Sequence, residues 1–172
     1  MHIWGAVILV VVLNVAVISD SATGKIKNRL ICTGLLVGLL YRIQAHGLSG
    51  FWDYAGGVLF MLLLTVPLFL FGAIGAGDAK LLAVVAGFLG TKAVPACFFL
   101  TFLLGALQAV LKMLWRKNLR KRLACLAGYV EKSLLERRLR PYGQALHEEE
   151  AVIHMSASIL FASLIYMIGG IL

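Results

Sequence analysis

The chain has 172 residues, of which 61% are hydrophobic and only 14% are charged. Soluble domains carry roughly 25% charged residues, so this composition excludes an ordinary soluble domain and predicts a membrane protein in contact with the lipid bilayer. The formal net charge of +8 would suit a nucleic-acid partner, but ten of the sixteen Lys and Arg residues fall within residues 112–140. Membrane topology explains such a cluster between apolar segments, and we predict no nucleic-acid partner.

Six apolar segments are candidates for membrane-spanning helices. A helical span needs about 20 largely apolar residues, whereas strands of a membrane barrel alternate apolar and polar side chains, and no such alternation is seen. A turn is needed near residues 90–92, because one helix over residues 79–115 would be about 55 Å long. The predicted fold class is all-α, a polytopic protein of about six transmembrane helices forming one domain over residues 1–172. The spans are expected at residues 2–18, 30–45, 54–74, 79–89, 94–115 and 151–171.

The positions of Lys and Arg predict the orientation of these spans, because cytoplasmic loops are enriched in basic residues. Lys25, Lys27 and Arg29 place the first loop in the cytoplasm, and residues 45–53, which lack Lys and Arg, are assigned outside. The alternation puts residues 72–80 inside and both termini outside. The first apolar run is expected to remain as a span, because it lacks the features of a cleaved signal peptide.

The long basic segment at about residues 116–150 has leucines at spacings of three to five between Lys and Arg. This pattern suits an amphipathic helix on the cytoplasmic membrane surface, and it also suits a solvated connector held to anionic lipid. No catalytic role is assigned to it.

Elimination leaves two acidic residues as candidates for chemistry. Asp20 and Asp78 both fall at the predicted cytoplasmic face, whereas Asp53 falls at the opposite face. The remaining acids belong to the basic segment or to a charge run typical of a solvated surface, and they are Glu131, Glu136, Glu148, Glu149 and Glu150.

Each of the two aspartates has a simple structural alternative. Asp20 lies between two serines and could cap a turn that leaves the membrane. Asp78 follows Gly72, Gly75 and Gly77, which would let an extended peptide approach closely, but it could also be the N-cap of the next helix. Lys80 could extend to the interface or pair with Asp78.

Other catalytic sets are not supported. The four histidines form no H-E-x-x-H, no G-x-S-x-G is present, and the three cysteines are widely spaced and expected to pack rather than to bind zinc. No metal and no cofactor are predicted. Two neighbouring carboxylates can hydrolyse a peptide without metal, one taking a proton from water while the other donates to the substrate, and which aspartate is the base stays open.

The segment from Gly75 to Leu82, GAGDAKLL, resembles the G-x-G-D-x-K-L motif of the type IV prepilin peptidase family. The segment from Asp20 to Asn28 resembles the family's other aspartate segment, although the usual proline is replaced by Lys27. By this resemblance, Asp20 and Asp78 would be catalytic, and Gly75, Gly77, Lys80 and Asn28 would be motif residues.

The resemblance implies a membrane aspartyl endopeptidase of the bacterial inner membrane that cleaves the leader of prepilin-like membrane precursors at the cytoplasmic face. The chain is similar to the short, single-domain members of tight-adherence or Flp pilus systems. It begins with a span and has no C-x-x-C, so we expect cleavage without N-methylation. The oligomeric state is not predicted.

Two alternatives use the same aspartates. A small ion-coupled transporter or a pilus assembly factor could use them to relay protons or bind cations. A broader G-x-G-D intramembrane protease would cut within the bilayer, with both aspartates deeper inside spans.

Overall fold

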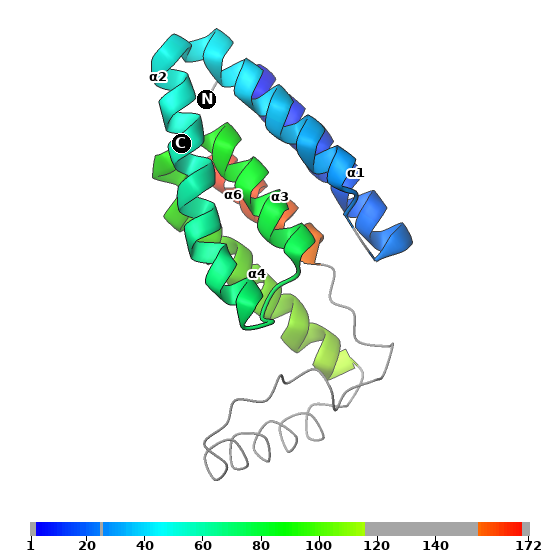
Figure 1. The fold of residues 1–172 in the computed structure, drawn as a ribbon. Coiled ribbons are helices and arrows are strands. Elements are labelled where there is room, and N and C mark those ends of the chain that lie inside the picture. Colours follow the sequence, from blue (N-terminus) through cyan, green and yellow to red (C-terminus); the bar gives the residue numbers. More distant parts are fainter. Residues whose placement is uncertain (1–2, 25, 116–154, 170–172) are drawn as a thin grey trace.

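A computed structural model describes residues 3–24, 26–115 and 155–169, and helices account for all regular elements in these ranges. The all-α class is therefore confirmed. The elements pack side by side as a bundle (Figure 1). They are α1 (Ile3–Thr23), α2 (Asn28–Leu70), α3 (Ala76–Leu89), a 3-10 turn η1 (Thr91–Ala93), α4 (Val94–Trp115) and α6 (Met155–Gly169).

The exterior of the bundle is apolar. Ile18 is 67% exposed, Leu63 is 71% exposed and Phe99 is 66% exposed, and these side chains belong to three different helices. Soluble monomers rarely expose large contiguous apolar surfaces. Three stretches, α1, α2 and residues 91–112, are long and apolar enough to cross a membrane, and α6 is a shorter apolar helix. The protein is therefore a membrane protein.

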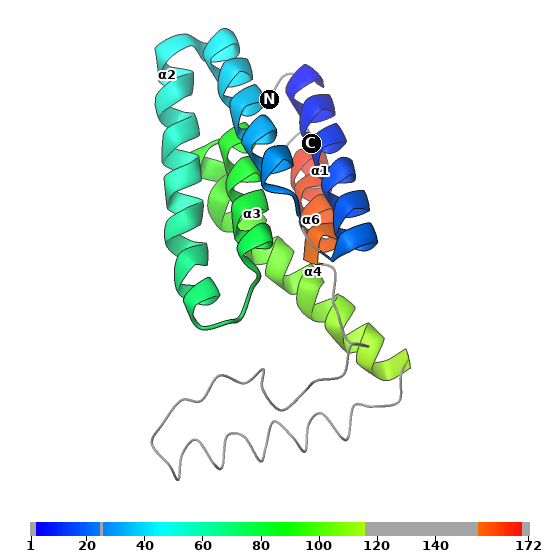
Figure 2. The same cartoon turned by 45° about the vertical axis from the view of Figure 1, so that its right-hand side comes forward.

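Helix α2 is broken at Gly47 and supplies two of the six predicted spans. Gly47 has φ 62° and ψ −142°, a conformation that favours glycine, and the chain turns back there, as Figure 2 shows. Tyr54 beyond the break donates a hydrogen bond to the Leu35 carbonyl before it, at 2.7 Å. The chain therefore turns within residues 45–53, the segment that the sequence assigns to the outside, and it is helical on both sides of Gly47.

Helix α3 is the centre of the bundle. Eight consecutive residues, Leu81–Phe88, are buried, which is typical of a helix surrounded by others. Their neighbours in the core include Leu13 of α1 and Ile159 of α6. Gly57 allows α2 to approach closely, because a Cβ there would lie 2.6 Å from the Ala86 carbonyl oxygen. With 14 residues, α3 is about 21 Å long, shorter than the roughly 30 Å hydrocarbon core of a bilayer.

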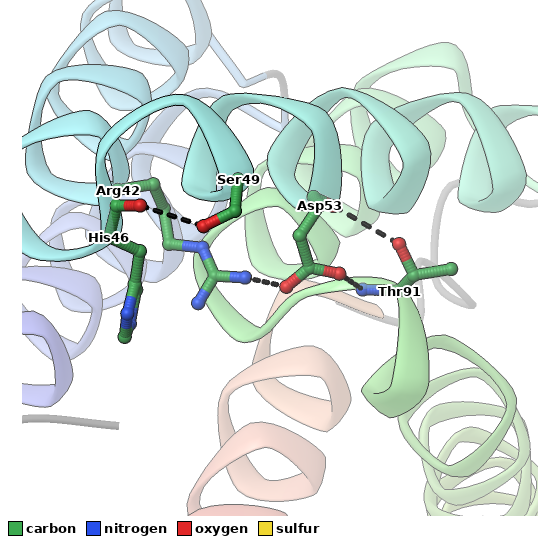
Figure 3. Close-up of polar contacts among 5 residues, drawn as sticks. All are labelled: Arg42, His46, Ser49, Asp53 and Thr91. Carbon is green, nitrogen blue, oxygen red and sulfur yellow. Dashed lines mark hydrogen bonds and ion pairs between the residues drawn. The ribbon is translucent and has the colours of Figure 1, made fainter.

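A cluster of polar side chains connects α2 to the start of η1 (Figure 3). Arg42, which is buried, forms an ion pair with Asp53 across the break in α2. Asp53 Oδ1 accepts a hydrogen bond from the Thr91 backbone N–H at 3.0 Å, and the Thr91 hydroxyl donates to the Asp53 carbonyl at 3.1 Å. Gly90 has φ +88°, so the turn predicted near residues 90–92 is confirmed.

The opposite end of the bundle holds both segments that carry the candidate residues. The end of α1, the start of α2, the start of α3 and the first described turn of α6 lie at this end in both views (Figures 1 and 2). The predicted amphipathic segment at residues 116–150 lies outside the described residues, and so do the histidines His2, His147 and His154.

Candidate active site

Asp20 lies inside α1 rather than in a loop after it. The helix continues to Thr23 and ends at Gly24, which has φ 63° and donates its N–H to the Asp20 carbonyl at 2.8 Å. The carboxylate of Asp20 points into the bundle, because the residue is only 8% exposed and its Oδ2 accepts a hydrogen bond from Ser156 Oγ at 2.6 Å. The alternative that Asp20 caps a turn was therefore wrong.

The glycine-containing segment before Asp78 closes α2 and opens α3. Gly72 has φ 72° and donates its N–H to the Phe69 carbonyl at 2.9 Å, so the chain can leave α2 sharply. Gly75 is the N-cap of α3, and Asp78 lies in the first turn of that helix. The alternative that Asp78 is the N-cap was therefore wrong, although a carboxylate in the first turn still interacts favourably with the helix dipole.

Gly75 lies directly beside the carboxylate of Asp78. A Cβ at Gly75 would be 3.0 Å from Asp78 Oδ2, closer than most Cβ contacts in proteins. The φ of Gly75 is −74°, which any residue can adopt, so space rather than backbone conformation explains the glycine here. Gly77 differs, because a Cβ there would be 3.4 Å from Ile26 Cβ, an ordinary contact distance.

The two motif segments contact each other. Ile26, in the connection between α1 and α2, packs over Gly77, and Lys80 Nζ donates a hydrogen bond to Asn28 Oδ1 at 3.1 Å. Three of the six predicted site residues, Gly77, Lys80 and Asn28, thus contact the other segment. The structure pairs Lys80 with Asn28, where the sequence offered Asp78 or the interface as its partner.

A cavity of about 570 Å³ adjoins Asp78. Its lining consists of the Gly72–Gly75 loop, Asp78, the face of α4 that includes Phe102 and Ala109, and Met155 of α6. Met155 precedes Ser156, the residue that holds Asp20. One turn of α6 therefore contacts both the cavity beside Asp78 and the carboxylate of Asp20.

The lining suits an extended chain better than a metal ion. Most of it is apolar or backbone, and it contains a single carboxylate. Within residues 3–24, 26–115 and 155–169, no three His, Cys, Asp or Glu side chains are grouped so that they could ligate a metal. A carboxylate at the edge of such a cavity can act as a general acid or a general base on a group held there.

Comparison with known proteins identifies the family of this chain. A model of the type IV leader peptidase family matches residues 7–110, which include both aspartates and the glycine segment. The chain belongs to that family. It is 29% identical over 119 residues to a protein of Bacillus subtilis (strain 168) named "Prepilin leader peptidase/N-methyltransferase". The match covers 66% of this chain and 46% of that protein, so the chain spans less than half the length of this relative. No solved structure matches.

Two features of the structure were missed by the sequence analysis. Nothing in the sequence connects Ser156 to Asp20, 136 positions earlier. The ion pair between Arg42 and Asp53 was also missed. The sequence could have indicated it, because a charged residue near a span usually has a partner.

Proposed function

We propose that this protein is a membrane aspartyl endopeptidase in which Asp20 and Asp78 act together. The observation that carries the proposal is the cavity beside Asp78, at the end of the bundle where Asp20 is held in the interior. A peptide bond in this cavity would lie next to one carboxylate and near the helix that positions the other.

The cavity also gives water a route to the site. Helix α3 is shorter than the hydrocarbon core is thick, so at least one of its ends lies at membrane depth. Irregular backbone at that depth is tolerated where it lines a water-filled cavity, and the Gly72–Gly75 loop lines this one. Hydrolysis requires such a water molecule beside the scissile carbonyl.

The two aspartates divide the chemistry between them. Like charges in one site do not both ionise readily, so one carboxylate is ionised and takes a proton from water while the other is protonated. The hydroxide that forms attacks the peptide carbonyl, and the protonated carboxyl donates its proton to the carbonyl oxygen. Collapse of the tetrahedral intermediate breaks the C–N bond as the nitrogen takes up a proton.

The substrate that we propose is the leader of a type IV prepilin-like membrane precursor. Family membership supports this substrate class. Lys27 lies in the connection at the active-site end and Arg29 lies in the first turn of α2. By the positive-inside rule, these charges support our assignment of this end to the cytoplasmic face of a multi-pass bacterial inner-membrane protein. We propose, as the family resemblance implies, that cleavage proceeds without N-methylation. The mass of the new N-terminus after incubation with a methyl donor tests this point.

The direct test is cleavage of a prepilin-like precursor by the purified protein in liposomes. Asp20→Asn and Asp78→Asn keep the side-chain shape and remove the acid–base group, so each is expected to lower the rate by roughly 10²–10⁴-fold. Asp53→Asn is the matched control, because Asp53 is the third aspartate of the chain and lies at the opposite end of the bundle. A wild-type rate in either Asp20→Asn or Asp78→Asn would reject the proposal.

The same liposomes distinguish the transporter alternative. A transporter that uses these aspartates would move protons or cations across the membrane and would leave a prepilin-like precursor intact. We expect cleavage and no aspartate-dependent flux.

A further inference from the structure

Ser156 contacts the carboxylate of Asp20 in the bundle interior. Ser156 is completely buried, and its Oγ donates to Asp20 Oδ2 at 2.6 Å. Hydrogen bonds from a hydroxyl to a carboxylate are short, about 2.5–2.7 Å, and roughly twice as strong as those between neutral groups. The contact therefore fixes the rotation of the carboxylate as well as its position.

The other two buried serines of α6 have different partners. Ser158 Oγ donates to Gln108 Oε1 of α4 at 2.9 Å, and Ser163 Oγ donates within α6 to the carbonyls of Ile159 and Leu160. All three bonds join a hydroxyl to a neutral group, and none of them reaches an aspartate. Ser156 thus differs in its partner from Ser158 and Ser163, which are buried on the same helix.

The place of Ser156 in the bundle connects it to the reaction. Helix α6 packs against both α1 and α3, the helices that carry Asp20 and Asp78. Met155, the residue before Ser156, lines the cavity beside Asp78. The turn that holds Asp20 is therefore also a wall of the space that we assign to the substrate.

We propose that Ser156 is a positioning residue, which holds the Asp20 carboxylate in the orientation needed for proton transfer in the reaction. This inference rests on the proposed function. General acid–base catalysis requires a hydrogen-bond distance of about 2.6–3.2 Å between the carboxylate and the group that exchanges the proton, and small misplacements lower the rate steeply. Loss of the Ser156 hydroxyl keeps the Asp20 carboxylate and removes the hydrogen bond that orients its Oδ2.

The experiment compares the steady-state kinetics of full-length variants in liposomes with one prepilin-like precursor. Ser156→Ala is expected to lower kcat by roughly 10–100-fold, the value of one hydrogen bond to a charged group, with KM within about twofold of wild type. Ser158→Ala and Ser163→Ala are the matched controls, and each is expected to keep kcat within about threefold, the size of one ordinary hydrogen bond. Thermal unfolding in detergent identifies any variant that fails to fold.

A second pair of variants separates the hydroxyl from the packing around it. Thr and Val have the same shape, so Ser156→Thr and Ser156→Val disturb the buried site equally, and only Thr can donate to Asp20. We expect Ser156→Thr to have the higher kcat by about tenfold at a similar unfolding temperature.

Equal kcat in the Thr and Val variants, with Asp20→Asn inactive, would overturn the role of Ser156 and leave the proposed function intact. Full activity in Asp20→Asn would overturn both proposals.

Discussion

The two ends of the bundle use polar residues in opposite ways. At the end shown in Figure 3, Arg42, Asp53 and Thr91 contact one another, and their hydrogen bonds hold the break in α2 against η1. At the other end, the Asp78 carboxylate adjoins a cavity of about 570 Å³. Asp53 is bound within a structural cluster, whereas Asp78 lies at the edge of a space that could hold a ligand. We therefore expect Asp53 to matter for stability and Asp78 to matter for activity.

Replacing one aspartate at each end with alanine should separate stability from activity. Asp53→Ala leaves the Arg42 guanidinium buried without its partner, which should lower the free energy of unfolding by roughly 3 kcal/mol. This is the lower end of the usual range, because the Asp53 side chain is 43% exposed. Asp78→Ala should abolish cleavage by the molecules that remain folded. Unfolding temperature and cleavage rate per folded molecule, measured on both variants, check the prediction.

The double variant Arg42→Met with Asp53→Ala provides the control for this pair. Removing both charges should restore part of the lost stability, because no unpaired charge remains buried. Recovery should be incomplete, since the Thr91 N–H also loses its acceptor at Asp53 Oδ1. If Asp53→Ala lowered cleavage per folded molecule as much as Asp78→Ala does, the hypothesis that the two ends differ in function would be rejected.

Gly75 and Gly77 offer a finer comparison within the active-site end. Gly75→Ala puts a methyl group 3.0 Å from Asp78 Oδ2 and should displace the carboxylate, lowering kcat by about tenfold or more. Gly77→Ala puts its methyl group at an ordinary 3.4 Å from Ile26 and should keep kcat within about threefold, since little has to move. Parallel kinetics of the two variants test this, and the reverse order of effects would contradict it.

The sequence predicted the helices well because their causes are local. Continuous apolar runs and basic loops predicted the positions of the five helices to within a few residues, and Gly90 indicated the turn before α4. The extent of the helices around Gly47 was not predicted, because the polar residues of this segment are satisfied inside the helices. Ser49 Oγ bonds the His46 carbonyl at 2.8 Å, and Asp53 bonds Arg42, so neither residue requires a loop.

The candidate site was predictable in part for a similar reason. Glycine spacing beside an aspartate is visible in sequence, and elimination of the other acidic residues leaves Asp20 and Asp78. The contact between Ser156 and Asp20 joins residues 136 positions apart, and it depends on how α6 packs against α1. Burial of Asp20 within α1 depends on the same packing. Tertiary contacts of this kind leave no periodic trace in one sequence.

The smallest expected effect concerns Lys27, where the family's motif usually has proline. Lys27 is the N-cap of α2 with φ −66°, close to the value at which the proline ring fixes φ. Among the described residues its N–H donates no hydrogen bond, while its carbonyl accepts one from the Leu30 N–H at 3.0 Å, a bond that proline can also accept. Lys27→Pro should therefore stabilise the protein by roughly 0.4–1 kcal/mol, because the unfolded chain loses freedom and the folded chain does not change. Cleavage should be retained, with only a small loss from the missing positive charge. A rise in unfolding temperature at unchanged kcat checks the prediction, and a marked fall would show that the connection before α2 has a different shape from the one described.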